Sequence, residues 1–96
     1  MNATASKSPL RLAVLISGTG RSLKNMLDRI ESGRLNARVV LVISSTPAAR
    51  GLQFAEKASI PIAVCERKDF PSQSEYSREI FDRCRKCEAE VVALAG

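Results

Sequence analysis

Hydrophobic residues along this chain gather in four short runs, and in the segments between the runs they recur every three or four positions. Each run is almost continuously apolar, which is typical of a parallel strand with both faces covered. The runs cover residues 10–16, 38–43, 62–65 and 91–95. We therefore expect four buried strands with helices between them.

The segment after the first run has the clearest helical spacing. Leu23, Met26, Leu27 and Ile30 recur at i, i+3, i+4 and i+7, so they form one apolar stripe along a helix. Gly33 follows the stripe and favours a helix C-terminus in the left-handed conformation. The spacing thus predicts a helix that ends just before Gly33.

Two more helices are expected in the second half of the chain. The weaker one runs from about Arg50 to Ala58 between two prolines, which break helices. The stronger one begins at Ser72, because Ser72 and Glu75 have the spacing of an N-terminal capping box. Its apolar face is predicted to comprise Tyr76, Ile80, Phe81, Cys84 and Cys87.

Strands that alternate with helices predict an α/β fold with a parallel sheet and right-handed crossovers. The order is β-α-β-α-β-α-β with helices on both faces, and it predicts that residues 10–96 form the first half of a Rossmann-like domain. Residues 1–9 are expected to be a disordered polar tail. Half of a doubly wound fold commonly has the strand order 3-2-1-4, which puts the fourth strand beside the first. Soluble proteins normally avoid an exposed apolar edge strand, so we expect a chain truncated after this strand, or another chain or copy that covers it.

Composition and charge exclude several classes of protein. Hydrophobic residues make up 45% of the chain and charged residues 26%, which is ordinary globular usage. No apolar stretch approaches the about 20 residues that a membrane span needs. The net charge of +5 could suit a nucleic acid, but the basic residues are not interleaved with aromatic residues as they are in single-strand nucleic-acid binders. Three cysteines without an export signal indicate reduced thiols and a cytoplasmic protein.

The strongest candidate for function is the loop between the first strand and the first helix. Gly18 and Gly20 allow a sharp turn and a close approach of backbone N–H groups to an anion, and Ser22 adds a hydroxyl at the helix start. Arg21 and Lys24 place two cations in the first helical turn, where the helix dipole disfavours each by about 0.3–1 kcal/mol. A bound phosphate would reverse that sign, so the segment favours an anion site over a plain turn.

Two common nucleotide fingerprints do not match this loop. A P-loop needs Gly-Lys-Ser/Thr where this chain has Leu23-Lys24-Asn25. A dinucleotide site needs a third glycine at position 23 and an acid after the second strand, where this chain has Ser44-Ser45-Thr46. NADP, with Arg50 against its 2′-phosphate, stays open as an alternative.

Other chemistry has little support in the sequence. Cys84 and Cys87 have Cys-x-x-Cys spacing, but the chain offers one more cysteine and no histidine, so we expect no metal site. The pair lies near the end of a predicted helix and not at its start, so the thiols lack the dipole that activates thioredoxin-type cysteines. Without histidine a Ser-His-Asp arrangement is impossible within the chain. Buried or half-buried thiols are the simpler expectation.

Residues 14–23 read Val-Leu-Ile-Ser-Gly-Thr-Gly-Arg-Ser-Leu. This segment resembles the start of phosphoribosylglycinamide (glycinamide ribonucleotide) formyltransferase, whose usual text is Val-Leu-Ile-Ser-Gly-Asn-Gly-Ser-Asn-Leu. The similarity continues in ungapped register through Arg50-Gly51-Leu52, Phe70-Pro71-Ser72 and the last strand. The resemblance implies transfer of a formyl group from 10-formyltetrahydrofolate, the co-substrate, to the glycyl amine of the ribonucleotide, a step of purine synthesis.

The resemblance also implies roles for individual residues. The family's folate-side arginine falls at Gln73, and its catalytic Asn, His and Asp lie beyond the last strand, so we expect no catalytic residue and no activity in this chain alone. Two alternatives stay open, a formyltetrahydrofolate deformylase-type enzyme and a non-catalytic module that binds a phosphometabolite or NADP and forms a homodimer through its last strand. The family's phosphate loop maps onto Gly20, Arg21 and Ser22, with Gly18, Thr19 and Lys24 beside them.

Overall fold

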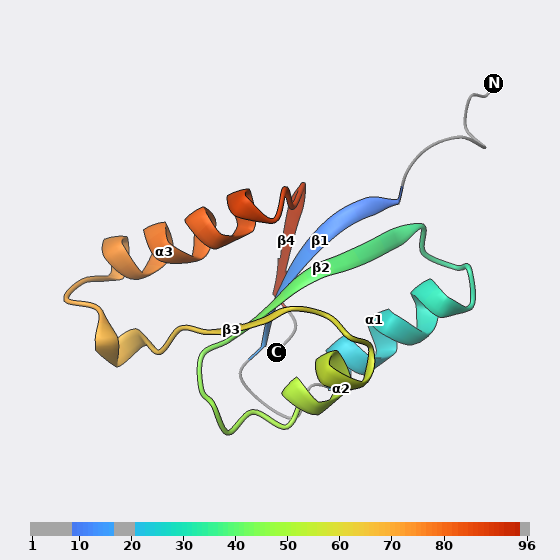
Figure 1. Cartoon of the computed structure of the whole chain (residues 1–96), viewed down its shortest axis with the longest axis horizontal. Helices are drawn as coiled ribbons and strands as arrows, with labels where there is room; N and C mark the ends of the chain where they lie inside the picture. Colours follow the sequence, from blue (N-terminus) through green and yellow to red (C-terminus); the bar gives the residue numbers. More distant parts are fainter. Residues whose placement is uncertain (1–8, 17–20, 95–96) are drawn as a thin grey trace.

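Figure 1 shows a computed structural model of the chain, which describes residues 9–16 and 21–94. Within these ranges parallel strands alternate with helices, so the predicted α/β fold is confirmed. The strands are β1 (Leu10–Ile16), β2 (Ala37–Ser44), β3 (Ile62–Val64) and β4 (Val91–Leu94). The helices are α1 (Arg21–Glu31), α2 (Leu52–Lys57) and α3 (Gln73–Lys86), with a 3-10 turn, η2 (Arg67–Asp69), before α3.

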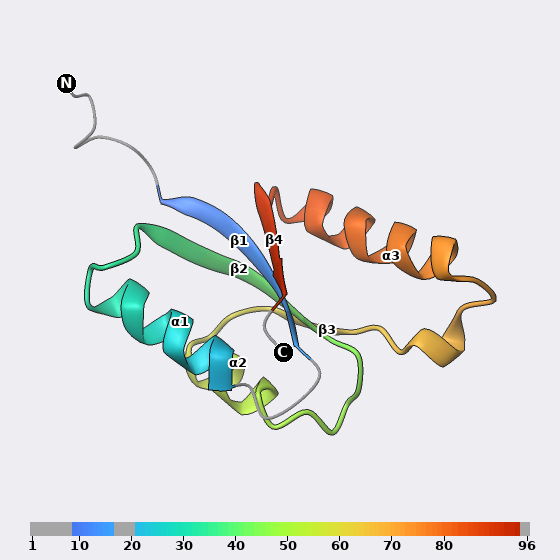
Figure 2. The same cartoon turned by 180° about the vertical axis from the view of Figure 1, so that it is seen from behind.

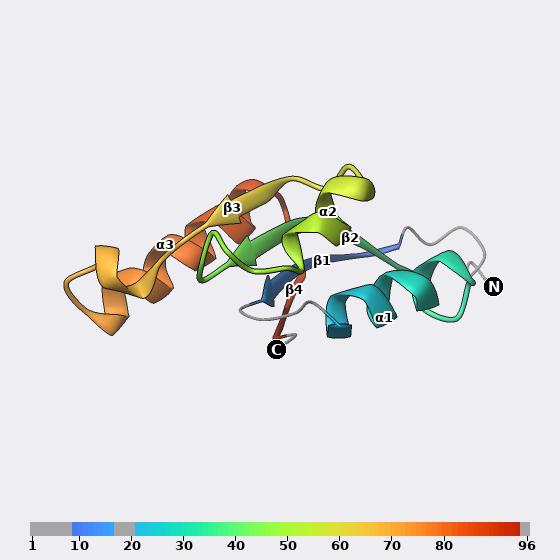
Figure 3. The same ribbon diagram turned by 90° about the horizontal axis from the view of Figure 1, so that it is seen from below.

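The sheet has the strand order β3-β2-β1-β4, as the commonest order for this fold predicts. Figure 3 shows the strands in this order from top to bottom. β1 and β2 pair over their whole length, from Leu10 opposite Ala37 to Ile16 opposite Ser44. These two central strands carry most of the buried residues, because helices cover both of their faces.

The two faces of the sheet carry different helices. α1 and α2 pack on one face around Leu23 and Ala55, both fully buried. α3 packs on the other face through Ile80 and Cys84. The two opposite views both show α1 and α2 close together and α3 apart from them (Figure 1; Figure 2). None of the helices in the described ranges is long and apolar enough to cross a membrane.

α3 begins where the sequence predicted, but its buried face differs from the predicted one. Ser72 Oγ accepts a hydrogen bond from the Glu75 N–H at 3.2 Å, so the capping prediction is right. The prediction that Phe81 belongs to the buried face is wrong, because 56% of its surface is exposed. Ile80 and Cys84, four positions apart, set the buried stripe, and Phe81 lies about 100° around the helix from Ile80.

α1 ends at Glu31, and Gly33 just beyond it has the predicted left-handed conformation, with φ at 83°. The Arg34 N–H donates to the Arg29 carbonyl oxygen at 2.9 Å, which is the long hydrogen bond of a Schellman motif. α2 and α3 end with the same bonding pattern at Ser59 and Glu88, each with φ at 58°. A residue with a Cβ thus occupies the left-handed position in two of these three helix ends.

β4 lies at one edge of the sheet, beside β1. The Arg11 N–H donates to Glu90 Oε1 at 3.0 Å, and the Glu90 N–H donates to the Arg11 carbonyl oxygen at 2.8 Å. Leu94 is 81% exposed and Val91 43%, so the predicted exposed, apolar edge is confirmed for residues 91–94. Residue 95 of the predicted strand and residues 1–8 of the predicted tail lie outside the described residues.

The second predicted helix is shorter than its pattern suggested. The prediction ran from Arg50 to Ala58, whereas α2 covers Leu52–Lys57. Gly51 is the N-cap of α2, and Arg50 lies in the turn before it. The later start of α2 matters for function because Arg50 lies in the turn before the helix, at the carboxyl end of the sheet.

Candidate anion-binding site

The candidate loop leads from the carboxyl end of β1 to the start of α1. Its predicted phosphate ligands Gly18, Thr19 and Gly20 lie outside the described residues. Arg21 is the first residue of α1 and is exposed. In a parallel sheet the loops after neighbouring strands meet at the same edge. The residues that follow β2 can therefore approach the start of α1.

A cavity of about 360 Å³ lies between the first turn of α1 and the start of α2. Its lining residues are Arg21, Lys24, Arg50, Gln53 and Phe54. Three of the five carry a positive charge, and they come from both walls of the cavity. The structure thus brings the predicted pair Arg21 and Lys24 together and adds Arg50 to them. Such a cavity can take an anion that touches both walls.

Lys24 has an acidic neighbour on its own helix. Its Nζ lies 3.2 Å from Asp28 Oδ2, and the two side chains are 55% and 60% exposed. An exposed pair of this kind contributes less than about 1 kcal/mol. Lys24 can therefore exchange Asp28 for a bound anion at little cost in stability.

Arg50 is carried by a turn with a well-anchored backbone. Ser44 at the end of β2 is fully buried, and its Oγ accepts a hydrogen bond from the Thr46 N–H at 3.1 Å. Ala49 and Gly51 on either side of Arg50 are buried, whereas the Arg50 side chain is exposed. Sequence reasoning considered Arg50 only for a 2′-phosphate. Its place after the second strand was the signal that connects it with Arg21.

The side chain of Ser22 faces a different part of the surface. It lines a depression of about 260 Å³ on the other flank of α1, together with Asn25, Met26, Arg29 and Leu35. Successive helical residues point about 100° apart, so the side chains of Arg21 and Ser22 diverge. The predicted phosphate role of Ser22 stays a prediction.

Gln73 also lies away from the cationic cavity. It lines an apolar cleft of about 390 Å³ with Tyr76, Phe81 and Leu94, on the face of the sheet that α3 covers. Gln73 Oε1 accepts a hydrogen bond from Arg67 Nε at 3.0 Å. Gln73 therefore lies apart from the cationic cavity that Lys24 lines, and the folate role of Gln73 stays a prediction.

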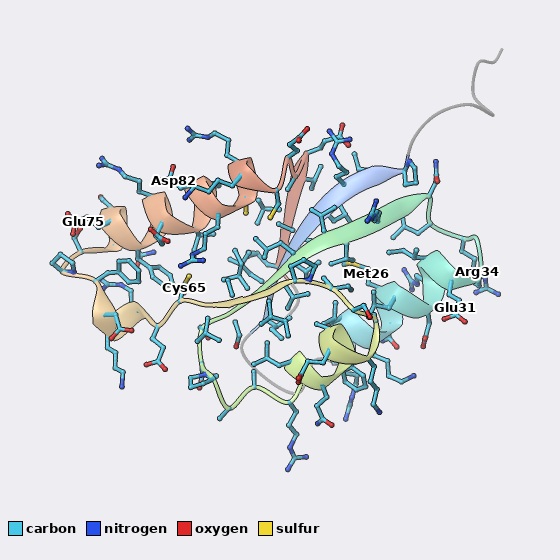
Figure 4. All side chains as sticks on the ribbon, in the orientation of Figure 1. Met26, Glu31, Arg34, Cys65, Glu75 and Asp82 are labelled. Atoms are coloured by element: carbon cyan, nitrogen blue, oxygen red, sulfur yellow. The ribbon has the colours of Figure 1, made fainter. Side chains whose placement is uncertain are left out.

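Cys65 packs beneath α3, Cys84 lies on the buried face of this helix, and Cys87 is its C-cap. Cys65 and Cys84 are buried and Cys87 is half-buried, as expected. Figure 4 labels Cys65 beneath the helix. Burial raises the pKa of the Cys65 thiol, and Arg83 partly opposes this shift. Burial, and then the neighbouring Cys87 and Cys65, raise the pKa of Cys84. Such thiols stay protonated at neutral pH and are poor nucleophiles. In residues 9–16 and 21–94, no three His, Cys, Asp or Glu residues form a group that could hold a metal ion.

Fold and cavity together define an α/β domain of the doubly wound class, with cations gathered at the carboxyl ends of its strands. The chain belongs to the formyl transferase family, whose model matches residues 10–96. The resemblance seen in residues 14–23 is thereby confirmed, and the chain is the N-terminal part of a formyl transferase domain.

Individual relatives agree with this assignment. The chain is 38% identical over 86 residues to the phosphoribosylglycinamide formyltransferase of Haemophilus influenzae, an alignment of 90% of this chain and 41% of that protein. It is 42% identical over 88 residues to the trifunctional purine biosynthetic protein adenosine-3 of Drosophila melanogaster, covering 90% of this chain and 6% of that protein. The structure of glycinamide ribonucleotide transformylase 1 from Symbiobacterium toebii matches with a TM-score of 0.87 and 33% identity, covering 92% of this chain and 42% of that one. The chain thus spans about two fifths of the length of the bacterial enzymes.

Proposed function

We propose that this chain is the substrate-phosphate-binding part of a phosphoribosylglycinamide formyltransferase that works in the cytoplasm in purine synthesis. The observation that carries the proposal is the cavity lined by Arg21, Lys24 and Arg50 in a chain of this family. The reaction would move a formyl group from 10-formyltetrahydrofolate to the amine of glycinamide ribonucleotide. The cavity would bind the phosphate that anchors this substrate.

The proposed phosphate contacts combine backbone and side-chain groups. Backbone N–H groups at the start of a helix bind phosphate with help from the helix dipole. Arg21 adds a charged guanidinium at a position where the family usually has a serine hydroxyl, and charge-assisted hydrogen bonds are about twice as strong as neutral ones. The proposed contacts are Gly20, Arg21 and Ser22, with Gly18, Thr19 and Lys24 beside them.

We assign no catalytic role to any residue of this chain. The attacking amine needs help with proton transfer, and the carbonyl oxygen needs stabilisation as it gains negative charge. Both tasks are proposed for the part of the relatives that this chain does not span. For the folate side, the apolar cleft beside Gln73 would accept an aromatic ring system, with Arg67 near its rim.

One observation favours a second candidate function. Leu94 and Val91 leave an apolar strand edge exposed, and such an edge readily pairs with another chain. A non-catalytic module could close its sheet by forming a homodimer through β4 while the cavity binds a phosphorylated metabolite. The two candidates share the anion site and differ in turnover.

Replacement of Arg21 tests the shared anion site. Arg21 is exposed, so Arg21→Ala should fold normally while it lowers the affinity for glycinamide ribonucleotide about tenfold, the effect of losing one charge-assisted hydrogen bond. Arg34→Ala removes the same charge from the far end of α1 and should leave the affinity unchanged (Figure 4). Equal ligand-induced thermal stabilisation of Arg21→Ala and the parent would remove Arg21 from the site.

Product analysis distinguishes the candidates. The chain alone should give neither formylated ribonucleotide nor free formate when it is mixed with 10-formyltetrahydrofolate and substrate. Formylated product from the purified chain would overturn the assignment of catalysis to the unspanned part. Release of free formate would favour a deformylase, and ligand binding by a stable dimer without turnover would favour the module.

A further inference from the structure

Arg67 is held at the start of α3 by two hydrogen bonds to uncharged acceptors. Its Nε donates to Gln73 Oε1 at 3.0 Å, and its Nη1 donates to the Phe70 carbonyl oxygen at 3.0 Å. The first of these bonds ties η2 to the first residue of α3. The guanidinium group is thus held in place although Arg67 is exposed. A side chain that is already ordered loses less entropy when it contacts a ligand.

The charge of Arg67 is not balanced by a neighbouring acid. Within residues 9–16 and 21–94, no carboxylate forms an ion pair with this side chain. The preceding residue, Glu66, pairs instead with Lys68, whose Nζ lies 3.3 Å from Glu66 Oε2. A guanidinium group has more N–H donors than the two that are used here. A carboxylate matches the remaining donors of Arg67 in charge and in planar shape.

Gln73 connects Arg67 with the apolar cleft on the α3 face of the sheet. Gln73 lines this cleft from the helix, and Leu15 and Leu94 line it from the ends of β1 and β4. The strand order reverses here, because β2 and β3 follow on one side of β1 and β4 lies on the other (Figure 1). Open α/β sheets bind ligands outside the carboxyl ends of their strands, at the point where the strand order reverses. The position of the cleft in the fold is therefore that of a ligand site.

The cleft and the cation beside it suit a ligand with an apolar body and a carboxylate. Tyr76 and Phe81 offer aromatic surface inside the cleft, whereas Arg67 offers charge next to Gln73. The co-substrate proposed above, 10-formyltetrahydrofolate, has this division, because its ring system is joined to a glutamate. The ribonucleotide substrate has no aromatic body, so its phosphate belongs in the cationic cavity and not here.

We propose that Arg67 binds a glutamate carboxylate of the folate co-substrate while the ring system lies in the apolar cleft. Gln73 is the positioning residue, because its Oε1 holds the Arg67 Nε. This inference rests on the proposed formyltransferase function. It gives the chain a second charged contact, separate from the phosphate contacts at the start of α1.

Calorimetric titration of the full chain with 5-formyltetrahydrofolate and with its dimethyl ester tests the proposal, because the ester keeps the ring system and loses the negative charges. The parent should bind the acid about tenfold more tightly than the ester, the effect of one charge-assisted contact. Arg67→Ala should remove this preference and leave the affinity for the ester unchanged. Gln73→Glu should reduce the preference, because the new carboxylate pairs with Arg67. Lys68→Ala removes a charge from the same turn and is the matched control, with both affinities unchanged.

Other results would overturn the proposal in distinguishable ways. Equal affinities of the parent for the acid and the ester, or an Arg67→Ala variant that keeps the preference for the acid, would remove the carboxylate contact. An equal loss in Lys68→Ala would show that only net charge matters, and an unchanged preference in Gln73→Glu would overturn the positioning role. A parent that binds neither probe would overturn the whole inference. The proposed phosphate site would still stand if Arg21→Ala weakens the binding of glycinamide ribonucleotide.

Discussion

Lys24 Nζ lies 3.2 Å from Asp28 Oδ2, one helical turn further along α1. The pair places a carboxylate beside a cavity that otherwise gathers cations, among them Arg21 and Arg50. Asp28 would therefore compete with the proposed anion for Lys24.

Removal of the Asp28 charge should strengthen anion binding. Asp28→Asn is expected to raise the affinity for phosphate about two- to threefold, because an exposed ion pair contributes about 0.2–1 kcal/mol. Calorimetric titration measures the change, and urea unfolding should show a loss of less than about 0.5 kcal/mol in stability. Asp82→Asn on the outer part of α3 is the control (Figure 4). An equal gain in both variants would contradict a local effect of Asp28.

The left-handed helix ends predict stabilising substitutions. Ser59 and Glu88 both have φ at 58°, a conformation that costs an L-residue about 1–2 kcal/mol and glycine nothing of this kind. Ser59→Gly and Glu88→Gly should each raise the free energy of unfolding by about 0.5–1 kcal/mol after the entropy of glycine in the unfolded chain is subtracted. Glu88→Gly keeps the carbonyl oxygen that accepts from Arg11 Nε at 2.7 Å.

Gly33→Ala is the inverse control, and urea unfolding is the measurement. An added Cβ at Gly33 would meet no atom within 4 Å, so a loss of stability would come from the backbone angle alone. A stabilising Gly33→Ala, or destabilising Ser59→Gly and Glu88→Gly, would show that these helix ends are not the ones that the structure describes.

The exposed β4 edge predicts self-association. Leu94 is 81% exposed beside the apolar cleft, so Leu94→Lys should disrupt association with little loss of stability. Sedimentation of the parent chain should show self-association, as a defined dimer if the chain is the binding module and as larger species if it is the enzyme part, and Leu94→Lys should sediment as a monomer. Val64→Lys, on the opposite edge at β3 with 40% exposure, is the matched control. A monomeric parent, or equal effects of both substitutions, would contradict a role specific to β4.

Buried thiols predict a loss of stability at alkaline pH. Burial raises the pKa of Cys65 and Cys84 in the folded chain above the usual value of 9.0. The unfolded chain therefore releases these protons at a lower pH than the folded chain, so stability is constant below about pH 8.5 and falls as the pH rises through the range above 9.0. Urea unfolding from pH 7 to 10 measures the slope. Cys65→Ala/Cys84→Ala should flatten it, and an unchanged slope would assign the effect to other groups.

Much of the fold could be predicted because its signals are local. The first strand matches its predicted bounds, and β2 differs by one residue at each end. Ser72 and Gly33 mark helix ends through their own side-chain and backbone chemistry. The errors occurred where local rules are weak. Phe81 is apolar but lies off the buried stripe. Ser59 has a left-handed backbone conformation, which a serine, unlike a glycine, does not predict.

The candidate site divides in the same way. The charged pair Arg21 and Lys24 could be found from the sequence, since both lie in one helical turn after a glycine loop. Arg50 could not be joined to them by spacing, because it is separated from Lys24 by a whole strand. The structure also separated Ser22 and Gln73 from the cavity, since helix rotation and the far face of the sheet direct them elsewhere.

By itself the sequence determined the alternation of strands and helices and the resemblance to formyltransferases, and it predicted an anion site at the first loop. These properties depend on residues that are neighbours in the chain or one helical turn apart. The tertiary structure alone decided that Arg50 faces Arg21 and Lys24 across one cavity. The physical reason is the parallel pairing of β1 with β2, which brings the ends of two distant segments to the same edge of the sheet.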